Sequence, residues 1–100
     1  MSMLDKFDLA RLLVNPYSMG IIEALKDGAK NVQRISQERQ IPISACYRKV
    51  HELEDANIVS PDHTGRDGRM YRSAVFYRSN IRGFNITYDD TFDVQVKRKS

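Results

Sequence analysis

The sequence predicts an α+β fold in which helices fill the first half of the chain and β-hairpins the second. Two observations support this prediction. Between Leu4 and Leu53, apolar residues recur at intervals of three and four, which is the period of helices buried on one side. From Ile58 onward, β-branched and aromatic residues alternate with polar ones around glycine and aspartate turn signals, which is typical of hairpins. With 41% hydrophobic residues in 100, the chain can form one small globular domain.

Two helices are expected first. Apolar residues at helical spacing predict one helix over residues 3–13 and a second over 16–26. Asn15 can cap the second helix, and Pro16 suits its first position because that position needs no backbone N–H. Gly28 then ends the second helix.

Two more helices follow, joined by a short turn. Asn31 caps the third helix, which ends before Pro42 because the residue preceding a proline disfavours helix. Pro42 can open the fourth helix, which Asn57 ends. Offsets of three and four in this helix predict one buried apolar stripe made of Ile43, Cys46, Val50 and Leu53.

Strands are expected from Ile58 onward. Pro61 confines the first strand to a sheet edge or a bend, because proline cannot donate to a strand ladder. A glycine-containing hairpin tip over residues 64–68 leads to a return strand over 70–77. The segments GFNITY and TFDVQV alternate around an Asp-Asp turn and predict a second hairpin.

Helix, tight turn, helix, strand and arginine-rich hairpin, in this order, are typical of a winged helix-turn-helix. We assign residues 1–78 to this domain and 79–100 to a C-terminal β-hairpin extension of it. A winged helix-turn-helix places one helix in the DNA major groove and a basic hairpin beside it. A net charge of +3 agrees with a polyanionic partner.

Residues 12–75 resemble the ArsR-like winged-helix regulators of bacteria and archaea. The resemblance rests on Ile35-Ser36 in the third helix, on LEDANIV over residues 53–59 and on GRMYR over residues 68–72. It implies a transcription regulator that binds DNA. Gln40 and Asn57 stand where the family usually has glycine, and the cysteine pairs or His and Asp ligands of its metal-sensing members are missing. We therefore expect no metal and no other cofactor.

The predicted DNA contacts lie on the third helix, the fourth helix and the hairpin. Arg48 can bond guanine with two hydrogen bonds, and Tyr47 can touch a base edge or a phosphate. The other side chains are expected to position the protein on phosphates or in a minor groove. The predicted contact residues are Gln33, Arg34, Ser44, Ala45, Tyr47, Arg48, Lys49, Arg66, Arg69 and Arg72. The alternative is that these helix cations only face water and the hairpin arginines pair with Asp62 and Asp67.

A homodimer is expected, because winged helices commonly read two half-sites about one DNA turn apart. The predicted dimer surface is the first helix, through Leu4, Phe7, Arg11 and Val14, and the tail hairpin is the second candidate. The alternative for both surfaces is that they only complete the core of the monomer.

Other functions find little support in the sequence. There is no catalytic motif, so we expect no enzyme, no catalytic residue and no small-molecule ligand. Cys46 sits on the apolar stripe and is expected to be a buried hydrophobe rather than a redox site. A metal site of His51, His63 and Asp62 is the weaker alternative to an exposed His51.

The expected location is the cytoplasm, at the nucleoid. A single cysteine fits a reducing compartment, and no apolar run reaches the length of a membrane span, so no membrane partner is expected. The expected partner is double-stranded DNA. The rival hypothesis is a winged helix that binds another protein, since the fold alone does not decide function.

Overall fold

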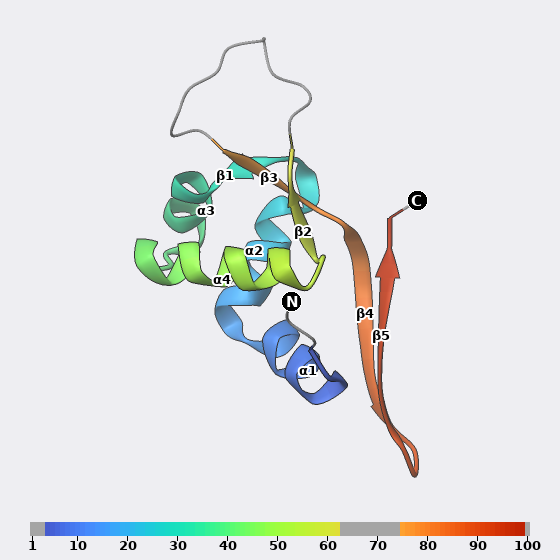
Figure 1. Ribbon diagram of the computed structural model, residues 1–100. Helices are drawn as coiled ribbons and strands as arrows, with labels where there is room; N and C mark the ends of the chain where they lie inside the picture. Colours follow the sequence, from blue (N-terminus) through green and yellow to red (C-terminus); the bar gives the residue numbers. More distant parts are fainter. Residues whose placement is uncertain (1–3, 63–74, 100) are drawn as a thin grey trace.

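The computed structural model describes residues 4–62 and 75–99, which form four α-helices, one 3₁₀ helix and five strands (Figure 1). The helices are α1 (Lys6–Val14), α2 (Pro16–Ala24), the 3₁₀ helix η1 (Leu25–Asp27), α3 (Val32–Arg39) and α4 (Ile43–Asp55). The strands are β1 (Lys30–Asn31), β2 (Val59–Pro61), β3 (Phe76–Ser79), β4 (Ile81–Tyr88) and β5 (Phe92–Arg98). The predicted α+β winged-helix class with a C-terminal hairpin is confirmed.

Polar caps set the ends of the helices. Asp5 accepts a hydrogen bond from the Asp8 N–H at 2.8 Å, so α1 begins at Lys6, later than the predicted start. Asn15 caps α2 as predicted. Beyond Ala24 the chain tightens into η1, where one continuous helix had been predicted, and Gly28 ends it with a φ of 147°.

The wing begins from a three-stranded antiparallel sheet of order β1-β3-β2. β2 pairs with β3 in the register Val59↔Ser79 to Pro61↔Tyr77, and β2 is an edge strand, as Pro61 predicted. The predicted hairpin tip and most of the predicted return strand lie outside the described residues. β1 was not predicted, because a strand of two residues leaves no periodic signal.

The second predicted hairpin is confirmed as the antiparallel pair β4-β5. Its register Phe84↔Val96, Ile86↔Val94 and Tyr88↔Phe92 puts these apolar side chains on one face, as the alternation predicted. At the turn, Asp90 takes the left-handed conformation, with a φ of 63°. This β4-β5 hairpin, the C-terminal ribbon, follows directly after β3, and its tip extends beyond α1 (Figure 1).

One hydrophobic core joins the helices to the base of the sheet. All four α-helices contribute buried side chains to it, together with Ile58, Val59, Tyr77 and Ile81. The predicted stripe of α4 is correct for Cys46, Val50 and Leu53 and wrong for Ile43, which is 44% exposed. Ile43 is the first residue of α4, almost a full turn before the buried stripe begins, and Ala45 is buried instead.

Candidate nucleic-acid interface

A turn held by two hydrogen bonds between Ser36 and Ile41 joins α3 to α4. Gln40 takes the left-handed conformation (φ 54°, ψ 46°), which glycine adopts most easily. The Ile41 N–H donates to the Ser36 carbonyl at 3.1 Å, and the Ser36 hydroxyl donates to the Ile41 carbonyl at 2.6 Å. Ile41 itself is buried, so the turn is tied to the core and fixes the angle at which α4 leaves α3.

The outward face of α4 is polar and continuous. Cys46, Val50 and Leu53 point into the core. The residues on the opposite side are spaced by three and four, so they share one face that looks into solvent. This outward face consists of Ser44, Tyr47, Arg48, His51 and Asp55, all of them exposed.

His51 was not among the predicted DNA contacts, although it belongs to the outward face. Its side chain is 64% exposed, and its Nδ1 lies 4.0 Å from Glu54. The signal was available in the sequence, because Ser44, Arg48 and His51 follow the i, i+4, i+7 spacing of one helix face. An imidazole at this place can donate to or accept from a base edge or a phosphate.

Two residues of the predicted contact set do not belong to the outward face. Ala45 is buried, with 8% of its surface exposed. The side chain of Lys49 is only 19% exposed and donates to Glu52 at 2.8 Å. Both positions lie toward the buried side of α4, so neither side chain is part of the outward face.

The cations of α3 and its surroundings are already paired. Glu38 accepts hydrogen bonds from Lys30 at 2.7 Å and from Arg34 at 2.6 Å, and these two bonds hold the pKa of its carboxyl below the usual value. Arg39 lies 3.4 Å from Glu23. Arg34 remains exposed beside Gln33 at the start of α3, where both can still reach a backbone phosphate.

Arg48 differs from these cations. Within residues 4–62 and 75–99 it has no ion-pair partner, and its side chain is exposed at the second turn of α4. A free guanidinium near the N-terminal end of a recognition helix is suited to base or phosphate contact. Arg66, Arg69 and Arg72 of the predicted wing lie outside the described residues.

Tyr77 of β3 belongs to the same hydrophobic core as the buried side of α4. This β3 side chain is buried, and burial, together with the charges of Glu54 and Tyr47, raises the pKa of its phenol. β3 and α4 therefore share one buried core. The two strands that lead to and from the predicted wing are thereby anchored on the helix that carries the outward face.

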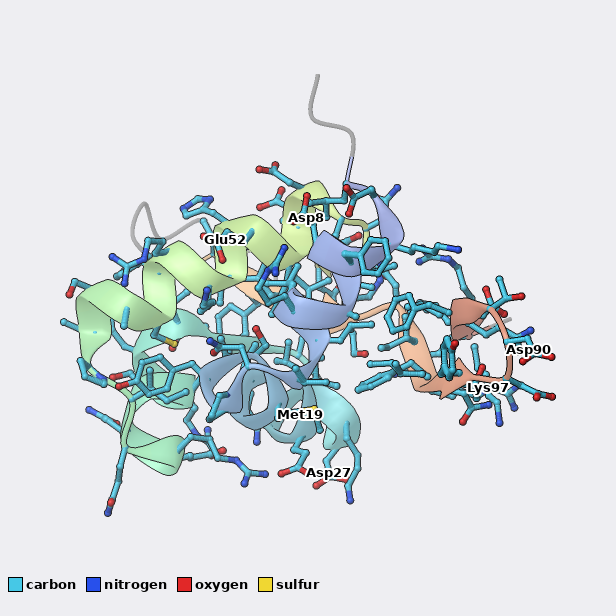
Figure 2. All side chains as sticks on the ribbon, turned by 90° about the horizontal axis from the view of Figure 1, so that it is seen from below. Asp8, Met19, Asp27, Glu52, Asp90 and Lys97 are labelled. Atoms are coloured by element: carbon cyan, nitrogen blue, oxygen red, sulfur yellow. The ribbon has the colours of Figure 1, made fainter. Side chains whose placement is uncertain are left out.

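A shallow hollow of about 440 Å³ lies between α1 and the C-terminal half of α4. Figure 2 shows two of its acids, Asp8 and Glu52, on these neighbouring helices. Asp8 bonds Arg11 at 2.6 Å, and Glu52 bonds Lys49. Because these charges satisfy one another, the hollow offers few free polar groups to a ligand.

The predicted dimer residues, Leu4 just before α1 and the other three within it, are all on the surface. Leu4, Phe7 and Val14 are 41%, 55% and 56% exposed, and Arg11 is exposed and bonded to Asp8. Phe7 also stacks on Phe92 of β5, with ring centroids 4.8 Å apart and planes at 7°. α1 is thus attached to the C-terminal hairpin near its tip.

Two further predictions concern Cys46 and the alternative metal site of His51, His63 and Asp62. Cys46 is fully buried, its thiol lies 3.8 Å from the Val32 carbonyl, and burial raises the pKa of the thiol. Cys46 is therefore the buried hydrophobe that the sequence predicted. The described residues contain no cluster of three metal-ligating side chains, and His63 lies outside them.

Fold and site together define a winged helix-turn-helix with an exposed recognition face. No family model matches the chain. The chain is similar to the uncharacterized HTH-type transcriptional regulator MJ0229 of Methanocaldococcus jannaschii, with 27% identity over 79 residues that cover 76% of this chain and 83% of that protein. This similarity supports a helix-turn-helix regulator in general and does not extend to the ArsR-like group. In the part of the chain that the structure describes, no helix is both long and apolar enough to span a membrane.

Proposed function

We propose that the protein is a transcription regulator that binds a specific sequence of double-stranded DNA through α4. The observation that carries the proposal is the outward face of α4, where Ser44, Arg48 and His51 form one exposed polar row above a rigid core. A straight row of this kind fits the major groove. The regulator MJ0229, to which the chain is similar, is a transcriptional regulator of the same helix-turn-helix type.

Each side chain has a distinct proposed role. Arg48 bonds guanine O6 and N7, while Tyr47 and His51 contact base edges or phosphates further along the groove. Ser44, Gln33 and Arg34 contact the backbone and set the register. The wing arginines Arg66, Arg69 and Arg72 contact the flanking minor groove or phosphates. Two copies would bind two half-sites roughly 34–36 Å apart at the chromosome.

Charge pairing favours DNA over a protein partner. Acids that neutralise the outward face would favour a protein partner. Glu52 bonds Lys49 instead of Arg48, and Asp55 is the acid on the outward face itself, at the far end of α4. The N-terminal half of α4, which a recognition helix inserts most deeply, therefore remains positive.

The test is selection from random duplex DNA at two salt concentrations, followed by titration of the enriched site with variants. Arg48→Ala should lower affinity by about 1–3 kcal/mol and relax the preference at one base position. Arg82→Ala is the matched control, because it removes an exposed arginine and the same charge from β4, away from α4. Equal losses in the two variants would mean charge attraction without sequence reading. No enrichment and no binding at low salt would refute the proposal.

A further inference from the structure

The C-terminal ribbon has an open edge. β4 and β5 form a two-stranded sheet, and among the described residues no strand pairs with the second edge of β5. A two-stranded ribbon is marginally stable by itself, and an open edge of a sheet is a template for another strand. The occupant of that edge can be identified from the residues of β5.

The free stretch of β5 has defined ends. Near the hairpin tip, Lys6 of α1 donates to the Phe92 carbonyl at 2.8 Å. At the other end, Arg98 turns its guanidinium to the Asn57 carbonyl at 2.7 Å. Residues 93–97 lie between these two tethers, and Gln95 is their midpoint.

In this stretch, DVQVK, the same residue type, valine, stands on either side of Gln95, and residues of opposite charge, Asp93 and Lys97, stand at the two ends. In an antiparallel pair of two β5 strands related by a two-fold axis at Gln95, Asp93 of each copy faces Lys97 of the other. Val94 faces Val96, and Gln95 faces Gln95. Every opposed pair in this register is favourable: two ion pairs, two valine pairs and one amide pair.

The side chains needed for this pairing are free to make it. Asp93, Gln95 and Lys97 are exposed, and none of them has a hydrogen-bond or ion-pair partner within the described part of the chain. Figure 2 shows Lys97, and Asp90 at the tip, on the side of the ribbon that faces away from the helices. Val94 and Val96 are half-buried on the opposite face, so pairing would extend that apolar face across the axis.

The edge of β4 lacks this complementarity. Its sequence IRGFNITY, paired with itself about Asn85, would set Arg82 against Tyr88 and Gly83 against Thr87. Charged residues on an edge strand usually prevent pairing with other chains. On β5 the register centred on Gln95 opposes Asp93 to Lys97 at both ends, whereas registers centred on Asp93 or on Lys97 would oppose like charges, so this edge is complementary to a second copy of this chain.

We propose that two copies of the protein form a dimer by antiparallel pairing of their β5 strands, centred on Gln95. The interface is isologous, as two-fold symmetry requires, and produces a four-stranded sheet. It places the two α4 helices on separate bodies joined through this sheet. The inference concerns the free protein and does not depend on DNA binding.

Charge exchange tests the register. Asp93→Lys sets two lysines against each other at both ends of the interface, and Lys97→Asp does the same with two aspartates. Each single variant should raise the dimer dissociation constant by about tenfold or more, measured by sedimentation velocity without DNA. The double variant on one chain, and an equimolar mixture of the two single variants, should both recover the wild-type dissociation constant. A wild-type protein that stays monomeric at millimolar concentration, or a dimer that no exchange affects, would overturn the proposal and direct attention to α1.

Cross-linking tests the position of the axis. Cys46 is buried, so a cysteine introduced on the ribbon is the accessible thiol among the described residues. Gln95→Cys should form a covalent dimer under mild oxidation, because directly opposed residues of antiparallel strands lie within disulfide distance. Asn85→Cys is the matched control, since Asn85 is the exposed partner of Gln95 on β4. Equal cross-linking of both variants, or of neither, would contradict pairing through β5.

Discussion

A buried hydroxyl in α2 leads to a prediction with an unusual sign. Ser18 is fully buried, and within the described residues its Oγ has no hydrogen-bond partner. A hydroxyl removed from water without a new partner costs roughly 1–3 kcal/mol in proteins. Replacing Ser18 with alanine should therefore stabilise the fold, whereas most core substitutions destabilise it.

The magnitude follows from three contributions. Loss of the unpaired hydroxyl gains at least about 1 kcal/mol. Alanine is a better helix former than serine by roughly 0.5 kcal/mol in a helix interior, and by less in the first turn of α2, where Ser18 lies. The small void left by one oxygen removes about 0.3 kcal/mol. We expect Ser18→Ala to raise the free energy of unfolding by about 1–2 kcal/mol, which is roughly 5–15 °C in melting temperature for a domain of this size.

The assay is urea unfolding followed by far-ultraviolet circular dichroism. The midpoint should rise while the slope of free energy against urea stays constant. Two other serines are controls for the same change. Ser44→Ala, on the exposed face of α4, should stay within about 0.5 kcal/mol of wild type. Ser36→Ala loses the bond to the Ile41 carbonyl and should destabilise by about 0.5–1.5 kcal/mol. A loss of stability in Ser18→Ala would show that its hydroxyl is bonded and refute the reasoning.

Two further predictions concern α4 and the turn before it. Burial raises the pKa of the Cys46 thiol, so the thiol should stay protonated above its usual range, and alkylation by iodoacetamide at pH 8.5–9 should be slow in the native protein and fast in urea. Reaction at the rate of a free thiol without denaturant would contradict the burial of Cys46. Gln40→Gly should raise the free energy of unfolding by about 0.5–1 kcal/mol, because Gln40 holds a φ of 54° that glycine adopts without strain. In thermal melts, Gln40→Gly should therefore unfold at a higher temperature than wild type, whereas Arg39→Gly should unfold at a lower one because it weakens the end of α3. A lower melting temperature for Gln40→Gly would contradict this account of the turn.

Local chemistry made much of the fold predictable from the sequence. Asn15 and Asn31 cap helices wherever they precede a helical pattern, because their side chains bond the free N–H groups of the first turn. The ribbon was predictable because alternation over two strands and an Asp-Asp turn indicate a hairpin without tertiary information. The start of α1 was missed by a few residues, since an apolar residue before the Asp5 cap also fits the helical period.

The remaining features depend on tertiary contacts. β1 exists only because Lys30 and Asn31 meet Tyr77 and Phe76 from far along the chain. Lys49 is different, because it lies three residues after Cys46 and four before Leu53 and has Glu52 three residues further along the same helix, so helical spacing alone already turns it toward the buried side and gives it an acidic partner. A cation on a predicted outward helix is a weak indication of DNA contact until its acidic neighbours are known.

The same reasoning explains why the pairing of β5 required the structure. The DVQVK pattern is present in the sequence, but a charge-antisymmetric stretch matters only if its edge is free. The structure adds that β4 covers one edge and that Lys6 and Arg98 delimit the other, with Gln95 at the centre. In a dimer joined through β5, the ribbon rather than α1 would set the distance between the two α4 helices. Shortening the ribbon at its base would then change the preferred half-site spacing without changing the half-site sequence, which separates the dimer geometry from base reading.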